Sequence, residues 1–169
     1  MMKVDHHGRV AIVTGAGKGI GKATALLLAK SGAKMVLVGR SAQSINETKA
    51  EIEKITPDVI AIEADVADWQ AVKAMAEKAM DRFGRIDILV NNAGIDKQDK
   101  TREDQFTIDE IDDADYDRII NVNMKGHFNC VKAVAPYMKK QKYGRIVNVS
   151  STTGLDGRIA TAPYCASKA

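Results

Sequence analysis

The sequence predicts an α/β fold: a doubly wound parallel sheet with helices on both faces. Two features of the chain lead to this prediction. Short runs rich in β-branched residues alternate with longer segments in which apolar residues recur at helical spacing, and this is the pattern of repeated βαβ units. The short runs do not alternate apolar and polar residues, as expected for strands of a parallel sheet whose two faces are both covered by helices.

The elements of the first half are predicted from apolar runs and their end signals. A β-branched run at 9–14 ends in glycines and is expected to form a buried strand. The apolar positions of 20–31 recur at helical spacing, and Gly32 follows as a C-terminal stop. The other elements predicted here are strands at 35–38 and 59–62, a helix at 44–55 with Pro57 just beyond it, and a helix at 69–83 closed by Gly84.

The second half continues the alternation after a strand at 86–90. A polar stretch follows this strand, and then one long helix is predicted from about 115 to 138. A fifth strand is expected at 145–149, and a new helix begins near 162. No linker rich in Pro or Ser and no repeat divides the chain, so residues 1–169 are expected to form a single domain.

Composition and charge exclude several classes of protein. Of 169 residues, 45% are hydrophobic and 28% are charged, which is typical of a globular domain with a real core. The net charge of +3 is spread along the chain, and its densest basic run, Lys139, Lys140 and Lys142, is interpreted as a solvated helix end. A nucleic-acid partner is therefore not expected. No apolar run approaches the roughly 20 residues that span a bilayer, and residues 1–9 lack the apolar stretch of a signal peptide, so no membrane partner is expected.

The cysteines and histidines do not indicate a metal site. Cys130 and Cys165 have neither the number of a disulfide framework nor the spacing of metal ligands, and both suit a reducing compartment. The adjacent His6 and His7 lie in a polar tail and are interpreted as solvated residues. We expect a cytoplasmic protein without a bound metal.

A glycine-rich turn joins the first strand to the first helix. Residues 14–21 are Thr-Gly-Ala-Gly-Lys-Gly-Ile-Gly. Glycine lets the chain turn tightly and lets the backbone approach a pyrophosphate, and the helix N-terminus that follows offers unpaired N–H groups and the positive end of its dipole. A tight turn without a ligand is the alternative. The position of the turn, within the first βαβ unit, favours a dinucleotide site.

The motifs around this turn resemble those of the short-chain dehydrogenase/reductase family, whose fold is of the Rossmann type. The turn has the family's TGxxxGxG spacing, and Asn91, Asn92, Ala93 and Gly94 form its NNAG motif after the fourth strand. Asp65 and Val66 look like the pair that contacts the adenine. The cofactor-binding residues that the resemblance implies are Gly15, Lys18, Gly19, Ile20, Gly21, Arg40, Asp65, Val66, Asn92, Ala93, Gly94, Tyr164 and Lys168.

The end of the second strand indicates which cofactor is preferred. NAD sites place an acidic residue here to bind the ribose 2′-hydroxyl, but this chain has Gly39 at that position. Arg40 follows, and a guanidinium can hold a 2′-phosphate through paired hydrogen bonds. Lys18 adds a second cation in the glycine turn. NADP(H) is therefore predicted in preference to NAD.

Tyr164 and Lys168 match the family's YxxxK motif, and their spacing of four places them on one face of a helix. A free phenol, with a pKa of about 10, is a poor acid–base group near neutrality, and an ammonium group beside it stabilises the phenolate. The resemblance assigns the tyrosine as the acid–base group and the lysine as its partner and a ligand of the nicotinamide ribose.

A serine and an asparagine complete the predicted catalytic set. Ser151 stands thirteen residues before Tyr164, where a hydroxyl can stabilise the developing charge on a substrate carbonyl. Ser150 is the competing choice. Asn123 fits the family's NxxG pattern, in which the asparagine holds a water that relays protons to the lysine, and Asn121 is the alternative.

These residues together predict a reversible, NADP(H)-dependent conversion between a ketone and a secondary alcohol, of the carbonyl reductase or 3-oxoacyl reductase type. Its partner would be a small carbonyl or alcohol substrate. By family habit we also expect a homotetramer, built partly on the long helices.

Two features depart from the family pattern. The segment 95–113 is longer than usual and densely charged, and it is interpreted either as a solvated loop or as a loop that gates substrate or contacts a subunit. Family members also continue well past YxxxK, so the resemblance implies a Rossmann-type domain truncated after the start of that helix. The alternative function is a non-catalytic nucleotide-binding or interaction fragment.

Overall fold

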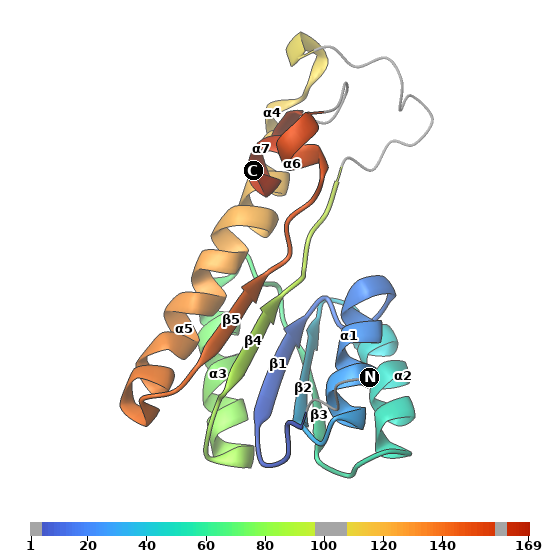
Figure 1. Cartoon of the computed structure of the whole chain (residues 1–169). Helices are drawn as coiled ribbons and strands as arrows, with labels where there is room; N and C mark the ends of the chain where they lie inside the picture. The colour runs from blue at the N-terminus through green and yellow to red at the C-terminus, as the bar shows by residue number, and fades with distance from the viewer. Residues whose placement is uncertain (1–4, 97–107, 158–161) are drawn as a thin grey trace.

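The computed structural model describes residues 5–96, 108–157 and 162–169 and contains one parallel sheet (Figure 1). Its order is β3-β2-β1-β4-β5, with every neighbouring pair parallel. The strands are β1 Val10–Thr14, β2 Lys34–Gly39, β3 Val59–Glu63, β4 Ile88–Asn91 and β5 Arg145–Asn148. The order places β1 at the centre and runs outward in two directions, which confirms the predicted doubly wound sheet.

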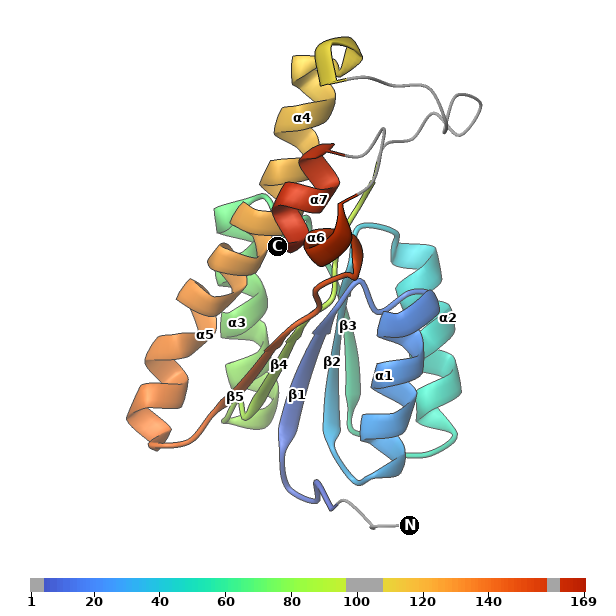
Figure 2. The ribbon, with the colours of Figure 1, turned by 45° about the horizontal axis from the view of Figure 1, so that its top comes forward.

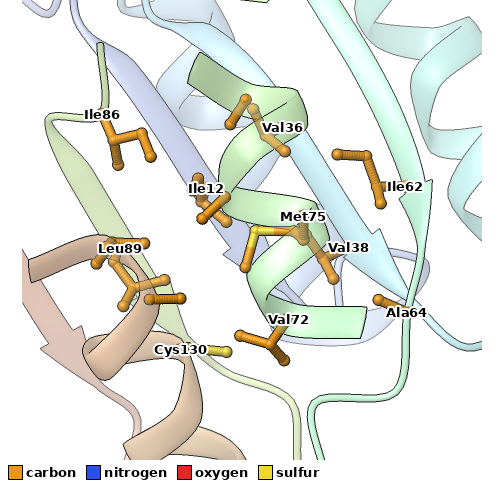
Figure 3. Packing of buried hydrophobic residues seen from close by; sticks show 14 of the residues in the cluster. Ile12, Val36, Val38, Ile62, Ala64, Val72, Met75, Ile86, Leu89 and Cys130 are labelled. Carbon is orange, nitrogen blue, oxygen red and sulfur yellow. The ribbon is translucent and has the colours of Figure 1, made fainter. Parts of the chain in front are cut away.

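Helices cover both faces of the sheet, as predicted. One face carries α1 (Gly19–Lys30) and α2 (Ala42–Glu53), and the other carries α3 (Trp69–Phe83) and α5 (Gly126–Gln141) (Figures 1 and 2). Two buried clusters fill these interfaces. In the cluster under α3 and α5, Met75 packs among Ile12, Val38 and Leu89, all of them shielded from solvent (Figure 3).

Local signals set the bounds of α3. The Asp68 side chain accepts a hydrogen bond from the Gln70 N–H at the start of this helix, and Gly84 ends it with a φ of 73°. An acidic N-cap and a left-handed glycine are strong end signals for a helix. The predicted range of 69–83 is therefore confirmed at both ends.

The prediction for the fourth strand was wrong at its start, because β4 begins at Ile88 rather than at residue 86. The Gln141 side chain at the end of α5 takes up the backbone of Ile86: its Oε1 accepts from the Ile86 N–H at 3.1 Å and its Nε2 donates to the Ile86 carbonyl at 2.8 Å. A distant side chain thus occupies the backbone groups of Ile86 that a strand would have used.

The predicted long helix consists of three successive parts. They are α4 (Asp113–Ile120), a π-helical segment (Asn121–Lys125) and α5. Single π-helical turns often occur where a helix serves a functional site. The chain also forms a short 3-10 helix (Ile108–Glu110), the four-residue helix α6 (Thr153–Asp156) and α7 (Ala162–Lys168). The structure thus adds the 3-10 helix, the π-helical segment and α6 to the predicted elements.

A buried carboxylate anchors the amino end of the sheet. The side chain of Asp87 is fully shielded, and it accepts hydrogen bonds from the Val10 N–H at 3.0 Å, from Arg9 at 3.2 Å and from both Arg85 Nε (2.7 Å) and Arg85 Nη2 (2.6 Å). The Arg9 guanidinium also lies 3.9 Å from the centroid of the Tyr143 ring. These contacts join the start of β1 to the residues just before β4. They lie at the end of the sheet opposite the carboxyl ends of the strands.

In the described part of the chain, no helix is both long enough and apolar enough to cross a bilayer.

Candidate active site

Two adjoining pockets open at the carboxyl ends of the strands. The first has a volume of about 260 Å³ and lies along the glycine turn, the end of β2 and Asp65. The second, of about 550 Å³, borders α6 and α7 and is lined by Ser151, Tyr164 and Lys168. Gly94 and Ile95 line both pockets. They follow β4, which pairs with β1 where the two halves of the sheet diverge, and open α/β sheets bind ligands at such a point.

The glycine turn leaves no room for side chains at its centre. Gly15 has a φ of 65°, and a Cβ there would lie 2.8 Å from the Asn92 Nδ2. A Cβ on Gly21 would collide with the Gly15 carbonyl oxygen and the Asn92 amide. Gly19 also has a positive φ, of 54°, and the space around it is open. The turn is therefore packed closely against Asn92, and Lys18, the N-cap of α1, lines the first pocket, which brings the start of this helix and its unpaired N–H groups beside that pocket.

Thr14 and Asn92 join this turn to the end of β4. Thr14 Oγ1 accepts from the backbone N–H groups of Asn92 and Ala93, both at 3.0 Å, and donates to the Val90 carbonyl at 3.3 Å. Asn92 Nδ2 donates to the Thr14 carbonyl at 2.9 Å. Thr14 belongs to the quoted motif, but sequence reasoning did not single it out as a functional residue. Its position at the last residue of a central strand is the signal that could have identified it.

The two predicted cations both border the first pocket. Lys18 and Arg40 are both exposed and both line this pocket, together with Ser41 and Ser44. Gly39 is the last residue of β2 and directly precedes Arg40, and a Cβ there would lie 2.8 Å from the Ile45 Cγ2. An acidic side chain at this position would therefore require Ile45 to move. Asp65 and Val66 line the same pocket, as their predicted role requires.

Lys168 is the most buried ionisable group of the second pocket, with a relative exposure of 6%. Its Nζ donates to the Val149 carbonyl at 2.8 Å and lies 6.0 Å from the centroid of the Tyr164 ring. Burial lowers the pKa of Lys168 below its ordinary value of 10.5. The helix α7 thus brings Tyr164 and Lys168 together beside the end of β5, as the YxxxK spacing predicted.

The two candidate serines make different contacts. Ser150 donates its hydroxyl proton to the Lys168 carbonyl and so ties the end of β5 to α7. Ser151 Oγ accepts from the Thr153 hydroxyl at 2.9 Å and from the Thr153 N–H at 3.3 Å. Both serines line the second pocket.

Asn123 lies in the π-helical segment and does not line either pocket. It is 1% exposed; its Oδ1 accepts from the Ile95 N–H at 2.8 Å, and its Nδ2 donates to the Ile95 carbonyl and to Ser167 Oγ, both at 2.9 Å. A Cβ on Gly94 would lie 3.3 Å from Lys168 Nζ and 3.4 Å from Asn123 Oδ1. Asn123 therefore stands behind the wall that the two pockets share, close to Lys168.

The helix face that carries Asn123 also carries a histidine that the sequence interpretation missed. His127 Nε2 lies 3.0 Å from the Ala93 carbonyl oxygen. The ring is half-buried, and burial, opposed by this hydrogen bond and reinforced by the charge of Lys168, lowers the pKa of His127. The spacing of four between Asn123 and His127 is the signal that could have shown that they share a face.

Only the two ends of the charged segment 95–113 lie among the described residues. Residues 97–107 of this segment lie outside the described residues. Ile95 and Asp96 line the second pocket, so the segment leaves the sheet at the wall of that pocket.

The chain is similar to a family of known enzymes over nearly all of its length. The family model described as short chain dehydrogenase matches residues 9–169. The chain is 42% identical over 162 residues to the 3-oxoacyl-[acyl-carrier-protein] reductase FabG of Thermotoga maritima, covering 96% of this chain and 63% of that protein. It is 41% identical over 161 residues to the (2S)-[(R)-hydroxy(phenyl)methyl]succinyl-CoA dehydrogenase subunit BbsD of Thauera aromatica, covering 95% and 62%.

Solved structures show the same similarity. A crystal structure of levodione reductase matches with a TM-score of 0.87 at 35% identity, covering 96% of this chain and 61% of that one. NAD+-bound xylitol dehydrogenase matches with a TM-score of 0.88 at 33% identity, covering 96% and 60%. The chain thus spans less than two thirds of the length of each of these four proteins. On the match of the family model and on these identities, the chain belongs to the short-chain dehydrogenase family.

Proposed function

We propose that residues 1–169 form a single dinucleotide-binding domain of an NADP(H)-dependent oxidoreductase that interconverts a ketone and a secondary alcohol. The observation that carries this proposal is the adjacency of the two pockets across Gly94 and Ile95, with Ser151, Tyr164 and Lys168 in the second pocket. A cofactor that lies along the first pocket would reach the acid–base residues of the second.

The residues present fit a dinucleotide. At Gly15 and Gly21 an added Cβ would collide with protein atoms, so only glycine lets the turn pack this closely against Asn92 beside the first pocket, and the space around Gly19 is open. The first pocket offers the N-terminus of α1 for the pyrophosphate and Asp65 and Val66 for the adenine. Ile20, Asn92 and Gly94 line the second pocket and would hold the nicotinamide end, together with Tyr164 and Lys168.

The preference for NADP(H) is supported by charge. Lys18 and Arg40 place two cations beside the first pocket, and Gly39 occupies the position of the carboxylate that NAD sites use. An arginine is well suited to a phosphate because its planar guanidinium forms two parallel hydrogen bonds.

Each of the four catalytic candidates has a distinct proposed role. When bound, the cofactor supplies the hydride that reaches the carbonyl carbon. Tyr164 donates its hydroxyl proton to the substrate oxygen, and the Lys168 ammonium stabilises the phenolate that remains. Ser151 can donate its own hydroxyl proton to the same substrate oxygen, because it acts as the acceptor in both of its hydrogen bonds with Thr153. Asn123, behind Gly94, connects the lysine to water. In the oxidative direction each proton transfer reverses.

The names of the relatives support the class of substrate. They include a 3-oxoacyl reductase, a hydroxyacyl-CoA-type dehydrogenase and a polyol dehydrogenase, which share a ketone and secondary alcohol as the reacting pair. We propose a small carbonyl compound or its alcohol as the substrate of this chain.

A homo-oligomer, with the tetramer as the expected state, is part of the same proposal. Tyr116, Met124 and Phe128 lie on the long helix and are 49%, 50% and 64% exposed, respectively. Large exposed apolar side chains on one helix are typical of a protein contact surface. Light scattering of the purified chain tests this part.

The test of the activity uses the 169-residue chain, NADPH and a panel of 3-oxoacyl thioesters and cyclic ketones, and follows absorbance at 340 nm. We expect turnover by the wild-type chain and a loss of at least about a hundredfold in Tyr164→Phe, with Tyr137→Phe as the matched control. NADPH binding without turnover would instead favour a non-catalytic nucleotide-binding domain, and the absence of both would overturn the proposal.

A further inference from the structure

Asn123 and His127 hold the same stretch of backbone at two neighbouring points. Asn123 binds both the N–H and the carbonyl of Ile95, and His127 binds the carbonyl of Ala93. Residues two apart in an extended chain are separated by about 7 Å, and residues four apart in a helix by about 6 Å. His127 and Asn123 therefore bind the carbonyls of Ala93 and Ile95, which lie on either side of Gly94. Residues 93–95 form the wall between the two pockets.

The hydrogen bond at Ala93 defines the state of the imidazole. A carbonyl oxygen only accepts, so His127 Nε2 must carry the proton that it donates over 3.0 Å. Burial and the positive charge of Lys168 both disfavour the charged ring, although the bond to Ala93 opposes them, and the pKa of His127 is lowered. At neutral pH the ring is therefore the neutral tautomer with its proton on Nε2.

The wall formed by residues 93–95 borders the two pockets and also lies close to Lys168 and Asn123. Ala93 lines the first pocket, and Gly94 lines both. A Cβ added to Gly94 would lie nearest to Lys168 Nζ and Asn123 Oδ1. A small displacement of residues 93–95 would alter the outline of both pockets and the distance to Lys168 at once.

The side chain of His127 binds the Ala93 carbonyl independently of the contacts that the helix backbone makes. The His127 carbonyl separately accepts from Asn91 Nδ2 at 3.4 Å, and a substitution of the imidazole keeps that contact. The helix also has its own attachments nearby, since Asn129 Nδ2 donates to the Val66 carbonyl at 3.0 Å. Loss of the imidazole should therefore free the Ala93 carbonyl, while Thr14 still holds the Ala93 N–H and α5 stays attached.

We propose that His127 is a positioning residue, whose neutral imidazole holds the Ala93 carbonyl and thereby sets the pocket wall against which the nicotinamide cofactor binds. This inference rests on the proposed function for its ligand. It concerns a residue outside the four catalytic candidates, and it acts through the backbone rather than on the reacting atoms.

The test compares cofactor binding in three variants of the 169-residue chain. His127→Leu removes the donor, His127→Gln retains an N–H at a similar reach, and Lys125→Gln changes an exposed residue of the same helix as the control. We measure the Kd for NADPH by the change in its fluorescence, and the thermal midpoint of each variant. His127→Leu is expected to weaken binding about tenfold, as the loss of one buried hydrogen bond would. His127→Gln is expected to recover most of the lost affinity for NADPH, and Lys125→Gln is expected to bind NADPH as tightly as the wild type does.

Unchanged binding by His127→Leu, or equal losses in the Leu and Gln variants, would overturn the proposal. If substrate turnover is measured, the Leu variant should raise the KM for NADPH by a larger factor than it lowers kcat, because Ala93 lines the cofactor pocket directly and the wall affects Lys168 only through Gly94.

A second measurement does not depend on any ligand. In a chain with 15N-labelled histidine, the ring nitrogen shifts report the tautomer, and the resonance absent from His127→Gln identifies His127 among the three histidines. The Nε2–H tautomer is expected at neutral pH, and the Nδ1–H tautomer would overturn the proposal. If the wild-type chain does not bind NADPH, the proposed function fails, and the tautomer measurement still decides whether His127 holds Ala93.

Discussion

Asn92 donates two hydrogen bonds to Thr14: its backbone N–H donates to Thr14 Oγ1 at 3.0 Å, and its side-chain Nδ2 donates to the Thr14 carbonyl at 2.9 Å. These bonds join the last residue of β1 to the first residue beyond β4 and so hold the glycine turn against the NNAG segment. The Thr14 hydroxyl also accepts from the Ala93 N–H, so two backbone donors depend on one buried oxygen.

Thr14→Val should therefore destabilise the fold. Valine keeps the shape of threonine but leaves the N–H groups of Asn92 and Ala93 without their acceptor, which should cost about 2–3 kcal/mol. Urea denaturation measures the change in the free energy of unfolding. Thr14→Ser keeps the hydroxyl and is the control, and a serine variant as unstable as the valine variant would show that the methyl group, not the hydroxyl, stabilises this junction.

Arg40→Asp should change the preference between cofactors. The substitution places a carboxylate beside the 2′ position and removes a guanidinium, so the KM for NADPH should rise at least about tenfold more than the KM for NADH. Steady-state kinetics with both cofactors give this ratio. Lys54→Asp, which makes the same charge change at the exposed end of α2, should leave the ratio as in the wild type. An unchanged ratio in Arg40→Asp would count against a 2′-phosphate site at Arg40.

Burial of Lys168 should make the stability of the fold depend on pH in the alkaline range. Because the pKa of Lys168 is lowered by burial, the unfolded chain binds its proton more tightly than the native chain does. Stability should then rise with pH between the lowered native pKa and the ordinary value of 10.5. Lys168→Met lacks the ammonium group, so its stability should not rise with pH for this reason.

The measurement is urea denaturation of the wild-type chain and of Lys168→Met at a series of pH values from 7 to about 10. The difference between them isolates Lys168 from the other groups that titrate there. If the difference in the free energy of unfolding between the two proteins stays constant across this range, burial does not disfavour the charged form of Lys168.

Asp87→Asn should destabilise the amino end of the sheet by about 2 kcal/mol at neutral pH. Burial by itself raises the pKa of Asp87, but hydrogen bonds from Arg85, the Val10 N–H and Arg9 outweigh it, and the pKa lies below its ordinary value of 3.8. A carboxyl with a lowered native pKa stabilises the fold above its unfolded pKa, and this contribution is lost as the pH falls through the native value.

The gap in stability between the wild-type chain and Asp87→Asn should therefore be widest near pH 7, and it should narrow only below the ordinary pKa of 3.8 and close once the pH falls below the lowered native pKa. Chemical denaturation at pH 7 and at a pH below the native pKa measures it. Glu77→Gln, an exposed change on α3 whose partner Lys73 is also exposed, should show little difference at either pH.

The sequence predicted the parts of this fold that local signals determine. The range of α3 followed from its apolar spacing and from Gly84, and YxxxK placed Tyr164 beside Lys168, because a helical spacing of four is a local geometric fact. The roles proposed for these residues stay predictions.

The parts that the sequence could not predict depend on contacts between distant segments. The start of β4 was displaced by Gln141, which is 55 residues away in the chain. The π-helical segment carries no periodicity of its own over five residues, and α6 is only four residues long. His127 is an ordinary helical residue in the sequence, and its contact with Ala93 appears only once β4 and α5 lie side by side.

The π-helical segment makes this long helix sensitive to its length. Each residue of an α-helix turns the chain by about 100°, so an added or deleted residue within Asn121–Lys125 would change the rotational phase between α4 and α5 by roughly that angle. Either α4 or the face that carries Asn123 and His127 would then point away from its present neighbours. A substitution at one position removes one contact, whereas a change of a single residue in length would misalign one whole side of the helix with the sheet.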